Sequence, residues 1–445
     1  MKRPERFGPC SGSAISSVPA IVVLALAASA AFGQAIQRAA FVANNGNLEG
    51  SVSSFVFAPD GAPLLVQKVI TGQREDINEY EPGCNAYTIS ITPDGRYLAT
   101  GHASSNDPLQ QITILQVAAD ATMTIVGEYP TPDTPLDVEW IDNRFLAATR
   151  TEVGMQNAVL VYEFDRDALT LTQVESENTG TFTTSLAVHP SRGFLYAGDS
   201  NVNRIYVFRT ESDGSLTPLQ SVGTGSTYPL GVSVSPDGNK LYAFGGISTG
   251  GHAILGYSIA ADGTLTAMGG TPFYSPGSSP KDGTFARDAS VLFVGHGTDA
   301  TARSFLIDYE TGQLTYTGYS FDVGIQGELG DLMVLDDYLL ITDNFYGATG
   351  LYCFDILPDG GFTQNGGLVS SQGIGPREIA GWSPCVGDID GDRIVDLADL
   401  SLLLASYGLC AGDPGFSGAA DLDGDGCVTL ADLATLLAHY GQSCP

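Results

Sequence analysis

The chain has 445 residues, of which 50 are acidic and 19 basic, and its net charge is −31. This charge argues against nucleic acid or an anionic membrane as a partner, because both repel an acidic protein. Hydrophobic residues make up 43% of the chain, so it can bury a large core and is not a disordered acidic tail.

The first 33 residues have the pattern of a secretory signal peptide. Basic residues at Lys2, Arg3 and Arg6 precede an apolar run from Ala20 to Ala31, which ends in small residues suited to cleavage. The run is too short to span a membrane, and no other stretch is long enough. We therefore expect residues 1–33 to be removed and the protein to be secreted, into an extracellular or periplasmic space.

The region from residue 36 to residue 383 repeats with a period near 50. A short apolar strand pattern recurs seven times, with gaps of 46 to 57 residues between its central positions Phe41, Leu98, Leu146, Tyr196, Tyr242, Phe293 and Leu340. A second alternating strand follows each of these, and a polar strand follows after a tight turn that is often Asp-Gly. From the second repeat onward, one more strand precedes the recurring strand. Four strands per repeat with almost no helical periodicity predict a mainly β protein with seven propeller blades.

The first repeat lacks the innermost of its four strands. The segment Arg377–Ser383, at the end of the seventh repeat, has the pattern of the missing strand. We therefore expect the two ends of the repeat region to share one blade, which closes the ring and removes exposed sheet edges.

The turns and hairpins of these repeats carry a family resemblance. The Ser-Pro-Asp-Gly turn at residues 235–238 and the Asp-Gly-x-Leu-Thr hairpins resemble those of the lactonase family of seven-bladed propellers, which includes 6-phosphogluconolactonases and muconate cycloisomerases. The resemblance implies a site on the face where the loops between blades meet the loops that follow the recurring strand. Polar residues expected on that face are His102, Asp199, His296, Glu328, Asp343 and Arg377.

Opening a lactone needs a base or an activated water, and a cation that holds the developing oxyanion or a substrate carboxylate. Arg377 with Glu328, His296 or Asp343 could supply these groups, because the sixth, seventh and first blades are neighbours. The alternative is that these side chains only hydrogen-bond the nearby backbone. The family resemblance also implies a Pro-Arg-His motif, of which only Pro-Arg is present before Glu378. This departure favours ligand binding over catalysis.

A unit of 21 residues occurs twice near the end of the chain, at 388–408 and 421–441, with 14 identical positions. Each copy begins with a twelve-residue loop that is acidic at positions 1, 3, 5 and 12, the spacing that wraps oxygen ligands around Ca2+. Position 7 lends a backbone carbonyl, and position 9 an oxygen directly or through water. The expected ligands of two Ca2+ sites are Asp388, Asp390, Asp392, Ile394, Asp396 and Asp399, and Asp421, Asp423, Asp425, Cys427, Thr429 and Asp432.

An amphipathic helix is expected after each loop, ending near Gly408 and Gly441. No helical pattern precedes the loops, so each unit has one helix where an EF-hand has two. The tandem pair, residues 385–445, resembles a type I dockerin, and this resemblance implies a small α-helical, EF-hand-like domain with a cohesin-like protein as its partner. Arg393 stands at position 6 of the first loop, where Gly is usual, and is expected to weaken that site.

Four cysteines surround these two helices, and an oxidising compartment favours disulfides among them. Three connectivities are open, and we favour Cys385–Cys410 with Cys427–Cys444. Cys353 lies in an apolar strand pattern and is expected to be a buried thiol.

Two functions agree with these patterns. The first is a secreted, calcium-binding protein whose dockerin-like module binds a partner protein, while its propeller binds a small molecule or a glycan. The alternative is a secreted hydrolase that opens lactones of sugar or aromatic acids and is anchored by the same module. The complete calcium loops and the incomplete catalytic motif favour the first function.

Overall fold

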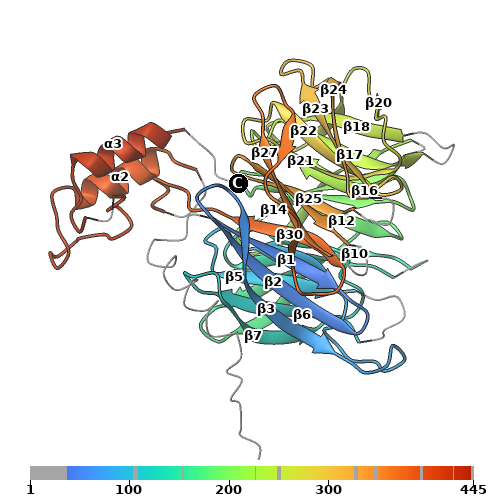
Figure 1. Cartoon of the computed structure of the whole chain (residues 1–445), viewed down its shortest axis with the longest axis horizontal. Coiled ribbons are helices and arrows are strands. Elements are labelled where there is room, and N and C mark those ends of the chain that lie inside the picture. Colours follow the sequence, from blue (N-terminus) through green and yellow to red (C-terminus); the bar gives the residue numbers. More distant parts are fainter. Residues whose placement is uncertain are drawn as a thin grey trace, which may run out of the picture. The chain divides into compact units, whose positions relative to one another are not determined.

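The computed structural model describes residues 38–103, 109–152, 155–225, 227–247, 252–324, 329–344, 349–390, 394–423 and 425–441. The expected signal peptide lies outside these ranges, as do Glu328, Asp392, Arg393 and Cys444. The described strands form seven antiparallel sheets, which are the blades of a propeller, as the repeats predicted (Figure 1).

The first three blades follow the chain from the first strand onward. From the centre outward, blade 1 contains β30 (Pro376–Trp382), β1 (Ala39–Asn45), β2 (Glu49–Phe57) and β3 (Pro63–Gln73). Blade 2 contains β4 (Ala86–Ile91), β5 (Tyr97–His102), β6 (Gln111–Val117) and β7 (Met123–Pro130). Blade 3 contains β8 (Val138–Trp140), β9 (Phe145–Arg150), β10 (Ala158–Asp165) and β11 (Thr170–Asn178).

The remaining blades have the same order of strands. Blade 4 contains β12 (Thr183–Val188), β13 (Phe194–Asp199), β14 (Arg204–Thr210) and β15 (Leu216–Gly223). Blade 5 contains β16 (Thr227–Val234), β17 (Lys240–Ile247), β18 (His252–Ile259), β19 (Leu265–Ala267) and β20 (Phe273–Tyr274). Blade 6 contains β21 (Pro280–Phe285), β22 (Val291–His296), β23 (Thr301–Ile307) and β24 (Leu314–Asp322). Blade 7 contains β25 (Leu329–Leu335), β26 (Tyr338–Asp343), β27 (Gly350–Ile356), β28 (Phe362–Gln364) and β29 (Val369–Ser370).

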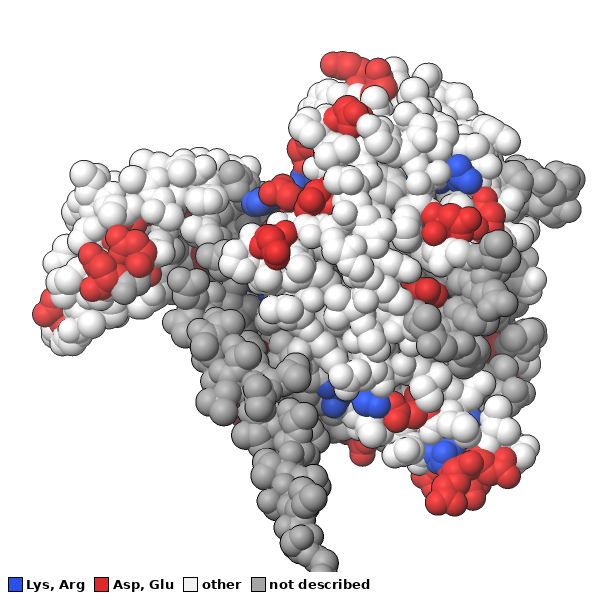
Figure 2. Space-filling view, viewed as in Figure 1, with Lys and Arg blue, Asp and Glu red and all other residues white. Residues whose placement is uncertain are grey.

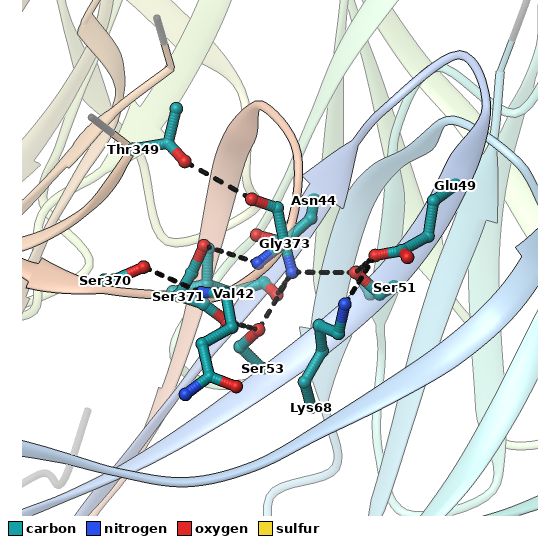
Figure 3. A network of polar contacts seen from close by, with 11 residues as sticks. Val42, Asn44, Glu49, Ser51, Ser53, Lys68, Thr349, Ser370, Ser371 and Gly373 are labelled. Atoms are coloured by element: carbon teal, nitrogen blue, oxygen red, sulfur yellow. Dashed lines mark hydrogen bonds and ion pairs between the residues drawn. The ribbon is translucent and has the colours of Figure 1, made fainter. Parts of the chain in front are cut away.

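The ring closes in blade 1, where β30 pairs with β1 from Ala39↔Trp382 to Asn44↔Pro376. This confirms that the last strand of the propeller completes the blade begun by the first (Figure 1). Buried polar contacts support the closure (Figure 3). The Asn44 side chain donates to the Ser53 hydroxyl at 2.9 Å, and that hydroxyl donates to the Ser371 carbonyl at 2.7 Å.

Apolar side chains fill the space between neighbouring blades. Between blades 2 and 3, for example, Ile112 and Ile114 of β6 pack in one cluster with Val138, Leu160 and Phe164, all of them buried. Each such side chain stabilises the fold by roughly 1.5–3 kcal/mol when it leaves water. The innermost strands contact each other in a closed circle, in the order β30, β4, β8, β12, β16, β21 and β25, and therefore line the central channel.

The Asp-Gly hairpins also form as expected, and they contact the preceding blade. Gly263 has a φ of +83°, and a Cβ at this position would lie 2.3 Å from the ring of Phe194. Only glycine suits this turn, because a side chain would meet both backbone strain and the aromatic ring. The Tyr196 hydroxyl donates to the Gly263 carbonyl at 3.0 Å, which fixes blade 5 on blade 4.

Two helices follow the propeller, α2 (Leu397–Ser406) and α3 (Leu430–His439), and they lie side by side (Figure 1). Asp396 and Thr429 cap them through complete capping boxes, which satisfy the free backbone N–H groups of the first turn. Among the described residues, no helix is long and apolar enough to cross a membrane.

The disulfide pairing differs from the expected one. Cys410 is bonded to Cys427, not to Cys385, and Cys385 is disulfide-bonded as well. The reason is an antiparallel bridge between Cys410 and Cys427, which brings their Cα atoms to 3.9 Å. The sequence separation of the cysteines does not reveal this bridge. Cys353 is a buried thiol, as predicted.

Candidate functional site

Each of the two repeated acidic loops gathers three carboxylates. Asp388, Asp390 and Asp399 each offer an oxygen within 4.8 Å of the others, and Asp421, Asp423 and Asp432 do the same in the second loop. The position 12 aspartates, Asp399 and Asp432, are fully buried. Elsewhere the negative charges are spread over the surface, in several groups on the face that Figure 2 shows.

Backbone N–H groups hold the buried aspartate of each loop in place. In the second loop, Asp432 accepts hydrogen bonds from the N–H groups of Leu422 at 2.7 Å, Asp423 at 3.1 Å and Thr429 at 2.6 Å. Asp399 accepts the equivalent bonds in the first loop. Burial raises the pKa of Asp432, but these hydrogen bonds outweigh burial and hold the pKa below its ordinary value. The carboxylate is therefore charged, buried and aimed into the loop.

The oxygens of the second loop fit a calcium ion. Asp421 Oδ1 is buried and has no hydrogen-bond partner among the described residues, although its other oxygen accepts the Gly426 N–H at 2.9 Å. A buried carboxylate oxygen without a partner is costly unless a cation binds it. Calcium prefers oxygen ligands such as carboxylates, which are the groups gathered here.

The structure also describes most of the other predicted ligands. Asp425 accepts the Cys427 N–H at 2.8 Å, so its side chain stabilises the loop. Asp396 and Thr429, at position 9, accept the N–H groups of Ala398 and Ala431 as helix caps. Ile394, at position 7 of the first loop, directly precedes Val395, which is fully buried. Asp392 lies outside the described residues.

The two repeated units form equivalent hydrogen bonds with each other. The Gly408 N–H, after α2, donates to the Val428 carbonyl of the second loop at 2.8 Å. The Gly441 N–H, after α3, donates to the Val395 carbonyl of the first loop at 2.7 Å. Each helix end therefore supports the loop of the other unit.

The predicted propeller residues fall in two places. His296 is fully buried at the end of β22, with Ser275 Oγ at 2.6 Å and the Thr301 carbonyl at 3.1 Å from its ring nitrogens. Asp343 is buried at the end of β26. These two residues end the second strands of blades 6 and 7, whereas Arg377 is on β30, at the channel. Glu328 lies outside the described residues.

The two remaining polar residues predicted on this face belong to the interior of blades. His102 contacts the Thr113 hydroxyl at 2.9 Å, and burial lowers its pKa to about 4, which keeps the ring neutral. Asp199 accepts the Phe182 N–H at 2.9 Å and the Thr183 hydroxyl at 3.0 Å. Both sets of contacts stabilise the loops of their own blades.

Arg377 lies at a β-bulge where β30 leaves its register with β1. Its guanidinium is 3.6 Å from the ring centre of Tyr87 and hydrogen-bonds the Tyr87 hydroxyl. Tyr87 and Lys281 also lie at bulges, in β4 and β21. A bulge turns a side chain away from the regular alternation of a strand, and these three bulged residues bring polar groups to the channel.

Five carboxylates on the channel side of the propeller were not among the site residues predicted from the sequence. They are Asp137 and Glu139 beside or on β8, Asp282 on β21, Asp331 on β25 and Glu378 on β30. Asp137, Asp282, Asp331 and Glu378 recur at intervals that are multiples of about 50 residues, each in an innermost strand pattern. An acidic residue at a matching position of several otherwise apolar strands is the signal that could have identified them.

The carboxylates have strongly perturbed acidities. Burial, followed by the charge of neighbouring carboxylates, raises the pKa of Asp137, Asp331 and Glu378 well above the ordinary range. Burial also raises the pKa of Glu139 to about 7, against the hydrogen bond from Ser90. Perturbed acids gathered at one place are typical of functional sites, although structural networks show them too.

Comparison with known proteins agrees with the propeller. A model of the lactonase family, described as a 7-bladed beta-propeller, matches residues 144–243. A 6-phosphogluconolactonase of Yersinia pestis (strain Pestoides F) is 35% identical over 105 residues, which are 22% of this chain and 29% of that protein. The chain thus spans less than a third of the length of the curated relatives it matches.

Solved structures share the whole ring. The periplasmic gluconolactonase of Pseudomonas aeruginosa is 18% identical with a TM-score of 0.61, and the match covers 78% of this chain and 99% of that one. A functionally unknown protein from Desulfotomaculum acetoxidans DSM 771 is 17% identical with a TM-score of 0.59, at 78% and 99% coverage. At this identity the likeness shows the fold alone, a lactonase-like seven-bladed propeller.

Proposed function

We propose that this protein is a secreted calcium-binding protein, in which a dockerin-like module binds a partner protein and the propeller binds a small molecule or a glycan. The observation that carries the proposal is the same cluster of three carboxylates in both loops, each with a fully buried aspartate. Three carboxylates so close together repel each other, and a bound divalent cation removes this repulsion.

The residues that would hold calcium are the carboxylates of the two loops. Asp388, Asp390 and Asp399 would hold one ion, and Asp421, Asp423 and Asp432 the other. Bound calcium supplies positive charge and fixes the loop, while the chain's own N–H groups orient the position 12 carboxylates. The exchanged contacts at Val395 and Val428 then link loop order to the order of both helices.

An exposed apolar face on the helices supports a protein partner. In α2, Leu397 is 64% exposed and Leu404 53%, and in α3 the equivalent Leu430 is 68% exposed and Leu437 53%. Exposed apolar patches that recur in both copies are unfavourable in water unless a partner covers them. The partner we propose is a cohesin-like protein.

Isothermal titration of the full chain with calcium tests the metal proposal. We expect two ions per wild-type chain, and one ion after Asp388→Asn or Asp421→Asn, because each substitution removes a ligand charge from one loop. Asp308→Asn, in an exposed turn of the propeller, is the matched control and should bind two ions. A wild-type chain that binds no calcium would refute the proposal.

The partner proposal has its own test. Binding of a cohesin domain should be measurable by surface plasmon resonance in calcium and should disappear in a chelator. The double variant Leu404→Asp with Leu437→Asp should lose the interaction while it still binds two calcium ions. Equal binding by this variant would show that the exposed face is not the docking surface.

A second candidate function is lactone hydrolysis by the propeller. The observation that favours it is Arg377, a cation beside the channel carboxylates in a propeller that is similar in sequence to a 6-phosphogluconolactonase. If the candidate holds, the protein opens gluconolactone or its 6-phosphate, and Arg377→Ala lowers the rate by about 100-fold. Arg204→Ala, at an exposed position, is the control. No hydrolysis by the wild-type protein would reject this candidate.

A further inference from the structure

The innermost strands hold their side chains in a repeating hydrogen-bond pattern around the channel. Asp331 of blade 7 accepts the Ile379 N–H of β30 at 2.9 Å. Glu378 of β30 accepts the Ile89 N–H of blade 2 at 3.3 Å. Asp137 of blade 3 accepts the Leu186 N–H of blade 4 at 2.6 Å. Each carboxylate therefore joins its own blade to the next one.

The Thr88 hydroxyl lies between two of these carboxylates. Its oxygen is 2.9 Å from Glu378 Oε1 and 3.1 Å from Asp137 Oδ1, and it accepts the Val138 N–H at 3.2 Å. A hydroxyl has one proton to donate, so it can satisfy only one of the two carboxyl groups. The other carboxyl must carry a proton of its own and donate it to the remaining lone pair of Thr88.

Asp331 adds a carboxyl group on the other side of the closing strand. It accepts the N–H groups of Leu332 at 2.7 Å and Ile379 at 2.9 Å, and the charge of Asp282 acts on it. The geometry thus requires one proton in the group around Thr88, with further carboxyl groups near it.

Three cations lie near the channel carboxylates and lower their pKa values. Lys281 donates to the carbonyls of Leu329 and Gly330, each at 2.6 Å, and its charge acts on Asp282 and Asp331. Arg377 stacks on Tyr87 and acts on Asp282, and Arg192 donates to the Trp140 carbonyl at 3.2 Å and acts on Glu139. Burial and the neighbouring carboxylates outweigh these charges.

We propose that the channel holds an exchangeable proton, shared by Glu378 and Asp137 through Thr88, and that its loss weakens the closure of the ring at β30. Glu378, one of the two carboxyl groups, is part of β30. Without the proton, neighbouring carboxylates on blades 7, 1 and 3 would repel each other across the strand that completes the ring.

The direction of the pH effect follows from the raised pKa values. Burial and neighbouring charges raise the pKa of Asp137 and Glu378 in the folded protein, whereas both groups are ordinary acids in the unfolded chain. From about pH 4 upward the unfolded chain loses protons that the folded protein keeps. Stability is therefore greatest at acidic pH and falls as the pH rises toward the folded pKa values.

Urea unfolding of the full chain at pH 5 to 9, at one fixed calcium concentration, tests the inference. The chain has two tryptophans, Trp140 and Trp382, one at the end of β8 and one at the end of β30, so indole fluorescence reports the propeller and not the helical module. The shared proton should make the unfolding constant rise by up to about tenfold per pH unit within its titration range, beyond the rise that Glu139 contributes.

Amide variants remove this dependence. Glu378→Gln and Asp137→Asn place a fixed donor where the protonated acid stood, so each should lower the rise by about tenfold per pH unit. Asp359→Asn, at an exposed turn, should leave the dependence unchanged. The same pH dependence in both amide variants as in the wild type would overturn the inference, as would a wild-type protein that becomes more stable between pH 6 and 8.

A second measurement keeps the inference testable if a variant does not fold. Wild-type protein unfolded by urea in weakly buffered solution at pH 7 should release protons, because the unfolded carboxyl groups ionise. The release is detected with an indicator dye. An absence of release would show that the channel carboxylates are already ionised in the folded protein and would refute the proposal.

Discussion

The acidic loops and the propeller channel both bring several carboxylates together, but their surroundings differ. In each loop one aspartate is buried and held by three backbone N–H groups, while its companions reach the surface and leave room for an ion. In the channel the carboxylates face each other and share hydroxyl and N–H donors between blades. One arrangement suits a metal ion and the other suits protons.

The comparison shows that clustered charge alone does not define a site. Backbone N–H groups stabilise an ionised carboxylate, as the lowered pKa of Asp432 shows. Burial and a neighbouring carboxylate stabilise the protonated form instead, as in Asp331, although two backbone N–H groups also bond it. The balance of burial, neighbouring charge and N–H donors therefore separates the two clusters.

The largest effect should come from Asp432→Ala in the second loop. The substitution leaves three backbone N–H groups without their acceptor, and we expect a loss of about 3–5 kcal/mol from the stability of the helical module. Circular dichroism should show less helix even in saturating calcium, while tryptophan fluorescence of the propeller stays unchanged. A change in that fluorescence would mean that loops and channel are not independent.

Removal of the disulfide should have the next largest effect. The Cys410–Cys427 bond closes a loop with a sequence separation of 17, and its loss should cost about 3 kcal/mol. The variant Cys410→Ser with Cys427→Ser should lower the midpoint of helix unfolding and the calcium affinity of the second loop. Cys353→Ser changes a buried thiol in blade 7 and should leave calcium affinity at its wild-type value. A similar loss of affinity in both variants would contradict a local role of the disulfide.

Glu139→Gln should change the pH dependence of the propeller's stability, which the channel carboxylates are expected to determine. Burial raises the Glu139 pKa from 4.5 to about 7, so the folded protein keeps a proton that the unfolded chain loses, and wild-type stability falls from about pH 4.5 to pH 7. The variant should equal the wild type at pH 4 and exceed it by about 3 kcal/mol at pH 8, because each pH unit between the two pKa values contributes about 1.4 kcal/mol. Urea midpoints at the two pH values measure this, with exposed Glu310→Gln as the control.

Added salt should have the smallest effect. It should weaken calcium binding by the acidic loops more than it changes the unfolding of the propeller. Asp390 and Asp423 are exposed, so raising the ionic strength from about 0.05 M to 0.5 M should weaken calcium binding by several-fold. The pH dependence of propeller unfolding should change less, because the channel carboxylates are partly or fully buried and salt screens buried charges less than exposed ones. Equal salt sensitivity of both properties would show that the channel carboxylates are accessible to solvent ions.

Much of the fold follows from local patterns in the sequence. The observed blades were predicted from the recurring apolar strands, such as those around Leu146 and Tyr196, from the Asp-Gly hairpins and from the closing strand after Arg377. These patterns suffice because every blade repeats the same local pattern of residues. The helices after the acidic loops were predictable for the same reason. The disulfide was not, because Cys410 and Cys427 meet through a bridge between the two repeats.

The candidate sites were predictable to different degrees. The acidic loops are contiguous, so the spacing from Asp421 to Asp432 contains nearly all of their geometry. The channel carboxylates come from four blades and meet only because the ring closes. The loops after the recurring apolar strands led to His296 and Asp343. They do not indicate that Asp282 and Glu378 lie near each other. Their proximity depends on the register of inner strands in different blades.

The pairing of β30 with β1 also determines when the propeller can be completed. The Ser53 hydroxyl bonds a carbonyl 318 residues later in the chain, so blade 1 is unfinished until nearly all of the propeller has emerged. Contacts between such distant residues slow folding, because a long loop must close before they form. The ring can therefore close only after almost all of the propeller has been synthesised, and β30, its last strand, is the one that completes it.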